Sequence, residues 1–339
     1  MHIYRYTADK QEQWDRFVRT SNNGNLFHYR NFLSYHIGRT FDDHSLIFEK
    51  NGHIVALFPA AVVERNGEKV LHSHPGASFG GFVFKNPYYS EVEEIIDSFE
   101  EYCISNGFDS TFFIPTPFSY FKDQNETFEY ALIWRGYQII EHYIFSIIDL
   151  KGSLDGIYRE IFRRKKRSKS YYRRLIKENN IRFEWNKNFD EFYPILVENK
   201  ARHGIKPTHT LDEITKLDKL FPGYFNLLMM YSGDVPVGGT LNFTANDRVA
   251  IIFYNMINYE YAHLQPASLQ VLESIKWGKK MGFDILDFGV SQLPEAPDPL
   301  TPSHSLIRFK EQLNSKGMIR KVFEKKFCTA VKNKQLNKN

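Results

Sequence analysis

A short pattern that occurs twice limits the folds available to this chain more than any other feature. Residues 106–109 read Asn-Gly-Phe-Asp and residues 281–284 read Met-Gly-Phe-Asp, and each set follows an amphipathic segment and precedes an apolar run. Upstream, Gly52 and Gly233 each lie in a turn between apolar runs. The two turn glycines are 181 positions apart and the two closing glycines 175 apart. Because the two pairs of glycines are separated by nearly the same number of residues, the sequence predicts an internal structural duplication.

The predicted elements follow the same order in both halves: two hairpins, a helix and a strand. In the first half a capping box of Ser90 and Glu93 predicts the start of the helix, and Gly107 predicts its end. In the second half Pro266, a favourable first-turn residue, begins the helix, and Gly282 closes it. The predicted strands are 45–49, 54–63, 69–73 and 110–114, and then 225–231, 235–243, 249–255 and 285–288.

A predicted strand at 143–150 and one long basic helix reaching residue 179 separate the halves. The fold class is therefore α/β (α+β), with two tandem lobes that are each a mixed sheet flanked by helices. We place the first lobe at 1–150, the second at 151–317, and a last strand with a basic tail at 318–339.

Composition narrows the class of protein further. The chain has 339 residues, 42% of them hydrophobic and 25% charged, which suits two globular domains. Two cysteines, Cys103 and Cys328, are too few for a disulfide framework or a cysteine-rich metal site. We find neither a signal peptide nor an apolar run of the roughly 20 residues that a membrane span needs, so we expect a cytoplasmic protein.

The long basic helix indicates an anionic partner. Residues 159–177 contain ten Lys or Arg and one acid, Glu160, although the net charge of the whole chain is +4. Tyrosines interleaved with these cations could stack on a base or a sugar. The alternative is a solvated basic helix that pairs with acidic residues of the other lobe. The predicted substrate-binding residues here are Arg163, Lys166, Arg167, Tyr171 and Arg174.

A helix start that directly follows a strand predicts an anion site at Gln265, Ala267 and Ser268, because free N–H groups at a helix N-terminus attract anions. Gly238 and Gly239 in the preceding strand would let a ligand approach the backbone, or would mark a simple bulge. We assign these five residues to cofactor binding.

Several polar residues are candidates for a substrate pocket. His203, Lys206 and His209 lie close together in sequence, although they could equally decorate a joint between a helix and a loop. His72 and His74 share one strand face without a third ligand nearby, so we predict no metal site.

Lys310 is the predicted catalytic residue. Residues 303–312 read as a short helix with Leu306 and Phe309 on its buried side and Lys310 beside that side. A lysine there can lie along apolar surface and bring its ammonium to a pocket rim. The alternative is an ordinary lysine that faces solvent.

Motifs in this order resemble the Fem-type aminoacyltransferases of peptidoglycan bridge formation and the FemAB-like GNAT proteins of polysaccharide and cell-wall gene neighbourhoods. The resemblance covers most of the chain. It rests on Gly24-Asn25-Leu26-Phe27-His28 with Phe32, Tyr35 and His36, on the basic helix with Ile181, on the run from His203 to Thr210, on Asp287-Phe288-Gly289-Val290-Ser291, and on Leu306-Ile307-Arg308-Phe309-Lys310.

The resemblance implies two GNAT-like lobes and transfer of an acyl or aminoacyl group onto an amine of a cell-wall or polysaccharide precursor. It also implies that the last strand, 318–327, returns to the first lobe, that Phe309 and Lys310 lie at the acyl-transfer channel, and that Ser291 binds substrate. The donor is acyl-CoA or aminoacyl-tRNA. The chain departs from the family in lacking a long helical-hairpin arm and a Gly-rich CoA loop.

The expected chemistry is attack of a neutral amine on a thioester or ester carbonyl, with Lys310 stabilising the oxyanion and His209, or the substrate itself, assisting as base. The expected partners are an anionic small molecule or a lipid-linked sugar, with tRNA and peripheral membrane contact left open. The alternative function is non-catalytic binding of RNA or an anionic glycan through the same basic helix, which would show a steep dependence on salt.

Overall fold

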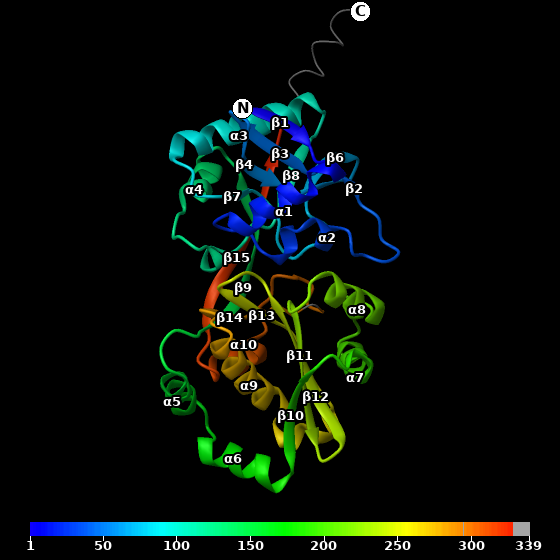
Figure 1. Cartoon of the computed structure of the whole chain (residues 1–339), viewed down its shortest axis with the longest axis vertical. Helices are drawn as coiled ribbons and strands as arrows, with labels where there is room; N and C mark the ends of the chain where they lie inside the picture. The colour runs from blue at the N-terminus through cyan, green and yellow to red at the C-terminus, as the bar shows by residue number, and fades with distance from the viewer. Residues whose placement is uncertain (294, 328–339) are drawn as a thin grey trace, which may run out of the picture. The chain divides into compact units, whose positions relative to one another are not determined.

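The structure is a computed structural model, and it describes residues 1–293 and 295–327 (Figure 1). The basic tail, 328–339, and with it Cys328, lies outside the described residues. Contacts divide the chain into two units: unit 1 contains Met1–His142 and the chain from Arg320 onward, and unit 2 contains Tyr143–Ile319. The chain passes from one unit to the other within β9 and again within β15.

Unit 1 contains two groups of paired strands with helices packed on them. One group has the order β1-β3-β4-β7 and the other the order β15-β8-β6-β5-β2. Its strands are β1 (His2–Arg5), β2 (Asp42–Asp43), β3 (Leu46–Lys50), β4 (His53–Phe58), β5 (Ala61–Arg65), β6 (Glu68–Ser73), β7 (Val83–Phe84), β8 (Ser110–Phe113) and β15 (Lys316–Lys326). Its α-helices are α1 (Gln11–Thr20), α2 (Arg30–Leu33), α3 (Tyr89–Ser105) and α4 (Thr127–Trp134).

Unit 2 is built on strands in the order β10-β11-β12-β13-β14-β9. Neighbouring strands are antiparallel except β13 and β14, which run parallel. The strands are β9 (Gln138–Asp149), β10 (Ile181–Asn186), β11 (Phe225–Ser232), β12 (Val235–Thr244), β13 (Val249–Ile257) and β14 (Ile285–Val290). The α-helices are α5 (Leu154–Arg164), α6 (Lys169–Glu178), α7 (Phe189–Ala201), α8 (Leu211–Leu220), α9 (Pro266–Lys280) and α10 (His304–Glu311).

The duplication is visible where a helix meets a strand in each unit. Gly107 after α3 and Gly282 after α9 both have positive φ, 69° and 87°. The next amide in each case bonds back into the helix, from Phe108 to the Cys103 carbonyl and from Phe283 to the Gly278 carbonyl, both at 3.0 Å. A residue without Cβ suits this left-handed turn. Both turns therefore close their helices in the same way.

The strands that follow these turns are also equivalent. β8 pairs in parallel with β6, starting at Val70 opposite Ser110, and β14 pairs in parallel with β13, starting at Val249 opposite Ile285. On its other side β14 pairs antiparallel with β9, and β8 pairs antiparallel with β15. The two units thus repeat one helix–turn–strand arrangement, and the predicted tandem α/β fold class is confirmed.

Three local predictions were wrong, each for a physical reason. The run 54–63 forms two strands in different sheets, β4 and β5, because the chain turns at Pro59, which has no N–H to donate to a ladder. The capping box of Ser90 and Glu93 does not form, because α3 begins at Tyr89, which places Ser90 inside the first turn and not at the N-cap, and the helix has no side-chain cap.

The predicted long basic helix is two helices, α5 and α6. The backbone turns extended at Lys165 (φ −73°, ψ 141°), and Ser168 caps α6 by accepting a hydrogen bond from the Tyr171 amide at 3.2 Å. Because serine favours helix N-caps, Ser168 was the sequence signal for this break.

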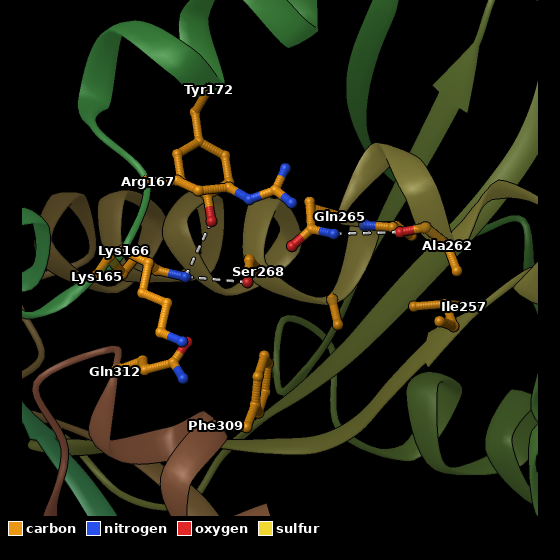
Figure 2. A pocket seen from close by; sticks show the side chains of 12 residues that line it. Lys165, Lys166, Arg167, Tyr172, Ile257, Ala262, Gln265, Ser268, Phe309 and Gln312 are labelled. Carbon is orange, nitrogen blue, oxygen red and sulfur yellow. Dashed lines mark hydrogen bonds between the residues drawn. The ribbon is translucent and has the colours of Figure 1, made fainter.

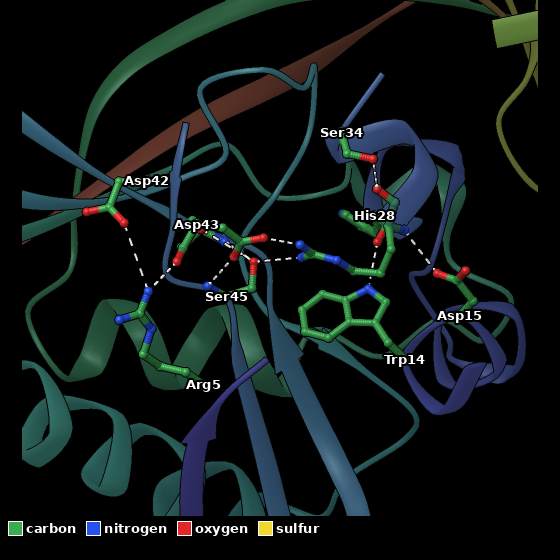
Figure 3. Close-up of polar contacts among 10 residues, drawn as sticks. Arg5, Trp14, Asp15, His28, Ser34, Asp42, Asp43 and Ser45 are labelled. Carbon is green, nitrogen blue, oxygen red and sulfur yellow. Dashed lines mark hydrogen bonds and ion pairs between the residues drawn. The ribbon is translucent and has the colours of Figure 1, made fainter. Parts of the chain in front are cut away.

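A buried charge cluster fastens the first helices of unit 1 to its strands (Figure 3). Arg30 is 7% exposed; its guanidinium contacts the carboxylate of Asp43 and donates to Ser45 Oγ at 2.9 Å. The guanidinium also lies 3.7 Å from the centre of the Tyr6 ring. Removing one partner of such a pair would leave a buried charge uncompensated, so we assign this cluster a structural role in holding α2 against the strands.

Among residues 1–293 and 295–327, no helix combines the length and the apolar composition that a membrane span requires.

Candidate functional site

A pocket of about 240 Å³ opens in unit 2 where α9 begins (Figure 2). Three structural parts form it: the α5–α6 junction, the N-terminus of α9, and one side of α10. The lining residues are Lys165, Lys166, Arg167, Tyr172, Ile257, Ala262, Gln265, Pro266, Ala267, Ser268, Phe309 and Gln312. The predicted residues Gln265, Ala267, Ser268, Lys166, Arg167 and Phe309 are therefore brought together.

The start of α9 points its backbone dipole at this pocket. Gln265 caps the helix in the left-handed conformation (φ 57°, ψ 42°), and Pro266 takes the first helical position. The Gln265 carbonyl accepts bonds from the amides of Ser268 and Leu269, both at 3.1 Å. The first turn contains no acidic residue. Pro266 has no N–H and the amides of Ser268 and Leu269 already donate within the helix start, so an anion would be attracted mainly by the partial positive charge of this terminus.

Lys165 supplies a buried cation beside this terminus. Its side chain is 9% exposed, and Nζ donates to Ser268 Oγ at 3.0 Å and to the Tyr172 hydroxyl at 3.2 Å (Figure 2). Burial, with a further contribution from the charge of Arg167, lowers the pKa of Lys165 from 10.5 to about 8. The lysine is mainly an ammonium at neutral pH, and an anion in the pocket would stabilise that charge.

The remaining wall comes from α10. Phe309 lies edge-on to Phe288 of β14 with ring centres 5.9 Å apart, which fixes the orientation of this helix. Gln312 lies on the same side of the pocket (Figure 2). The pocket therefore joins three cations and a helix N-terminus to two aromatic and two amide side chains, and none of the described lining residues is Asp, Glu or His. Such a pocket can bind an anionic group, and its described lining offers neither a carboxylate nor an imidazole as a general base.

Lys310 does not line this pocket, and it does not face solvent either. It is 2% exposed, and its ammonium donates to the carbonyls of Gly289 and Val290 at 2.7 and 2.9 Å. Burial lowers its pKa from 10.5 to about 8, while the carboxylate of Asp287 acts in the opposite direction. The ammonium thus ties α10 to the end of β14. The solvent-facing alternative is wrong because Lys310 is buried, and its predicted catalytic role stays a prediction.

His209 is also buried away from the pocket. It is 3% exposed, its Nδ1 lies 2.9 Å from the Tyr254 hydroxyl, and its ring packs against Phe243 and Phe253. His203 is exposed and lies 3.4 Å from the carboxylate of Glu295. Lys206 is exposed, and neither it nor His203 lines the pocket. None of the three lines the unit 2 pocket, and the roles predicted for them stay predictions.

Packing explains the glycine pair in β12. A Cβ on Gly238 would lie 2.6 Å from Gln270 and 2.7 Å from the Met256 carbonyl, and one on Gly239 would lie 2.6 Å from Phe192. Neither glycine lines the pocket, so their absent side chains serve the packing of α9 and α7 on the strand.

The other predicted contacts are dispersed. Arg163 and Arg174 lie exposed on α5 and α6, where they pair with Glu160 and Glu178. Tyr171 contacts the guanidinium of Arg167 just outside the pocket lining. Ser291 is fully buried, and its hydroxyl has no hydrogen-bond partner among the described residues.

Sequence reasoning missed Lys165, Ile257, Ala262, Pro266 and Gln312 as pocket residues. Lys165 was hidden inside a run of cations, and only the N-cap at Ser168 could have shown that it lies in a junction between helices. Gln312 follows α10 and carries no motif. Among the described residues, no three His, Cys, Asp or Glu side chains gather as a metal site would require.

The repeated helix–turn–strand units have counterparts in proteins of the tandem GNAT fold. Residues 163–296 match the family model described as an acetyltransferase (GNAT) domain. Over all of both chains the structure resembles one described as FemX, with a TM-score of 0.68 and 13% identity. The expected Fem-type resemblance is thus confirmed at the level of the fold.

Two further solved structures support the same fold. One is a tandem GNAT protein from the clavulanic acid biosynthesis pathway, with a TM-score of 0.53 and 8% identity over 97% of this chain and 99% of that one. The other is the C-terminal domain of a putative lysylphosphatidylglycerol synthetase from Agrobacterium fabrum, with a TM-score of 0.56 and 11% identity over 94% of this chain and 92% of that one. No curated protein matches the sequence.

Proposed function

We propose that this chain is an acyltransferase that moves an acyl or aminoacyl group onto an amine of a cell-wall or polysaccharide precursor. The observation that carries the proposal is the unit 2 pocket, in which the start of α9 and the buried Lys165 face one cavity. Acyl-CoA and aminoacyl-tRNA both carry phosphates, and phosphate is the group that such a site accepts best.

The pocket would hold the donor by its phosphate. Lys166 and Arg167 would neutralise charge at the mouth, and Lys165 would contribute a charge-assisted hydrogen bond from inside. Its volume of about 240 Å³ has room for a phosphate or pyrophosphate but not for a whole nucleotide, so the rest of the donor would extend outside it. Binding energy from this remote group would serve to position the acyl carbon.

In the reaction the neutral amine attacks the carbonyl carbon, a C–N bond forms, and the C–S or C–O bond to the carrier breaks. The amine loses a proton and the departing thiolate or alkoxide gains one, so no oxidant or reductant is needed. Lys310, buried on the carbonyls of Gly289 and Val290, is best described as a positioning residue for the end of β14. The catalytic roles expected for Lys310 and His209 stay predictions.

The acceptor class rests on analogy. One similar structure is described as FemX, and another as the C-terminal domain of a putative lysylphosphatidylglycerol synthetase, a name that indicates a lipid acceptor for that protein. For this chain we propose an anionic or lipid-linked sugar as acceptor, reached from the cytoplasm with peripheral membrane contact; the amine follows from the Fem-type resemblance.

The alternative, a polyanion-binding protein without catalysis, is favoured by the exposed cations of α5 and α6. Binding to RNA or an anionic glycan through Arg163, Arg173 and Arg174 would involve the helix surfaces and not the pocket. Its affinity would fall steeply and uniformly with salt.

A transfer assay with a matched pair of variants separates the two functions. The purified protein is incubated with radiolabelled acetyl-CoA or with a charged tRNA and a pool of amino-sugar acceptors, and labelled product is counted. We expect Lys165→Met to lower kcat/KM by about 10- to 100-fold, because a charge-assisted hydrogen bond contributes about 1.5–3 kcal/mol. Arg163→Met, an exposed cation outside the pocket, is the control and should leave turnover nearly unchanged.

Absence of turnover with either donor, together with RNA binding that Arg163→Met weakens and Lys165→Met does not, would overturn the proposal in favour of the binding protein.

A further inference from the structure

Helix α4 of unit 1 is apolar on the side that faces the core and also on the side that faces solvent. Phe128, Ala131 and Leu132 are buried in the core of unit 1. Tyr130, Ile133 and Trp134 are 60%, 49% and 70% exposed. The exposed three are spaced i, i+3 and i+4 and therefore share one face. Several large apolar side chains together on an exposed helix face are typical of an interaction surface, so this face calls for a partner.

The apolar surface continues onto the start of α3, against which α4 packs (Figure 1). The ring of Tyr89 lies 6.1 Å from that of Tyr130, and Tyr89 is 37% exposed. Tyr88, which precedes α3, is 85% exposed. We name Tyr88, Tyr89, Tyr130, Ile133 and Trp134 the α4 patch.

The area of the α4 patch suits one half of a protein interface. At about 200 Å² for each of its four aromatic side chains, the exposed fractions amount to about 500 Å². A stable interface buries about 800 Å² on each partner, of which about 57%, or roughly 460 Å², is apolar. One copy of the patch therefore provides the apolar part of a standard interface.

The charges around the patch indicate which partner covers it. Arg135 pairs with Asp97 and Glu100, and Lys321 pairs with Glu129. These cations are already neutralised by carboxylates. An anionic lipid surface attracts excess positive charge, which this rim does not offer. A rim of both signs is compatible with a second copy of the same surface.

We propose that the α4 patch is the contact surface of a homodimer, with Tyr130 and Trp134 of each copy at its centre. The same patch on both copies meets itself across a two-fold axis, which closes the assembly at two chains. Aromatic side chains suit the centre of such a contact because they bury a large area and lose few rotamers. The proposal is independent of the proposed function, because no patch residue lies in unit 2.

Sedimentation velocity over a concentration series from submicromolar to high micromolar tests this proposal. The wild-type chain should shift from monomer to dimer as its concentration rises. Trp134→Glu should weaken the dimer by at least about 30-fold, as expected for a central aromatic residue. Ile104→Glu is the matched control: Ile104 is 44% exposed near the C-terminal end of α3, and its replacement should leave the dimer intact.

Folding of each variant is checked by its melting temperature, and Tyr130→Lys, at another exposed position of the same face, repeats the test if Trp134→Glu fails to fold. A wild-type chain that stays monomeric throughout the series would overturn the proposal. A dimer that persists in both patch variants would do the same. Co-sedimentation of the monomer with phosphatidylglycerol vesicles that Trp134→Glu abolishes would assign the patch to a lipid surface and contradict the dimer.

Discussion

The two units share a framework but differ at the start of the equivalent helix. In unit 2, α9 begins with Pro266 after a left-handed Gln265, and the buried Lys165 lies beside it. In unit 1, α3 begins after the exposed Tyr88 and places Glu91 in its first turn. A carboxylate of the chain itself complements the helix dipole there, whereas the first turn of α9 contains no acidic residue. The two units thus share the helix–turn–strand corner but differ in the charge at the start of the helix.

The two units also differ in which buried side chains have a lowered pKa. Burial lowers the pKa of His28 and His74 in unit 1 to about 3, and that of His44 and His72 to about 4. In unit 2 burial lowers the pKa of Lys165 and Lys310 to about 8. Among these groups with a lowered pKa, those of unit 1 are histidine rings and those of unit 2 are lysines, so we expect the two units to respond to pH in different ranges.

Acidification should produce the largest difference between the units. The unfolded histidine binds a proton near pH 6.5 and the folded one only near pH 3, so below 6.5 the unfolded state binds more protons and stability falls. At pH 5 this costs about 2 kcal/mol for each of His28 and His74. Hydrogen exchange measured at pH 7 and pH 5 should show a larger loss of amide protection in unit 1 than in unit 2.

His74→Asn is the control for this prediction. Its side-chain oxygen can replace Nδ1 as the acceptor of the Gly76 amide, bonded at 3.1 Å, but it does not titrate. The acid sensitivity of unit 1 should become smaller in this variant. Loss of protection in unit 2 before unit 1 would show that the buried histidines do not govern the difference.

Removing the buried cation Lys165 should weaken anion binding at the start of α9, which is the feature that distinguishes it from the start of α3. Lys165→Met keeps most of the side-chain volume but removes the charge beside Ser268, and we expect affinity for pyrophosphate to fall by about 10- to 100-fold. Isothermal titration calorimetry measures this. Lys169→Met, which removes a cation that pairs with Asp155 outside the pocket, is the control. Equal losses in the two variants would mean that general charge, and not the pocket, attracts the anion.

Raising the pH should stabilise the protein through Lys310 of unit 2, whereas lowering the pH should destabilise unit 1. For Lys310 the folded pKa is about 8 and the unfolded value is 10.5. Between these values the unfolded state binds more protons, so stability rises with pH, by about 1.4 kcal/mol per pH unit at most for one group. Urea unfolding at pH 8 and pH 9.5 should show a smaller rise in Lys310→Met than in the wild type. Identical rises would mean that Lys310 is not buried as a strained cation.

Alanine substitution of the closing glycines, Gly107 and Gly282, should give the smallest effect on stability, and the two effects should be equal. Gly107 and Gly282 both have positive φ and no atom within 4 Å of an added Cβ, so alanine at either position meets backbone strain without a clash. We expect each substitution to cost about 1 kcal/mol of unfolding free energy. Costs that differ by much more than this between the two would count against equivalent positions.

The sequence predicted the parts of this fold that depend on local chemistry. Gly107 and Gly282 were found because a left-handed turn needs glycine, and the start of α9 because proline favours the first helical position. The sequence did not reveal the 3-10 helix, Tyr259–Leu264, that separates this start from β13. The break at Lys165 was missed because the cations around it masked the cap at Ser168. The burial of Lys310 was missed because its acceptors, the carbonyls of Gly289 and Val290, carry no signal in the identity of their residues.

Hydrogen exchange with and without donor tests the central claim most directly, since it reports on both helix starts in one experiment. The protein is compared alone, with acetyl-CoA and with a charged tRNA. The account predicts that one of these donors protects the amides of 165–168 and 267–269, that Lys165→Met weakens this protection, and that the start of α3 at 89–92 does not change. Protection at the start of α3 instead, or no protection at the α9 start with either donor, would contradict it.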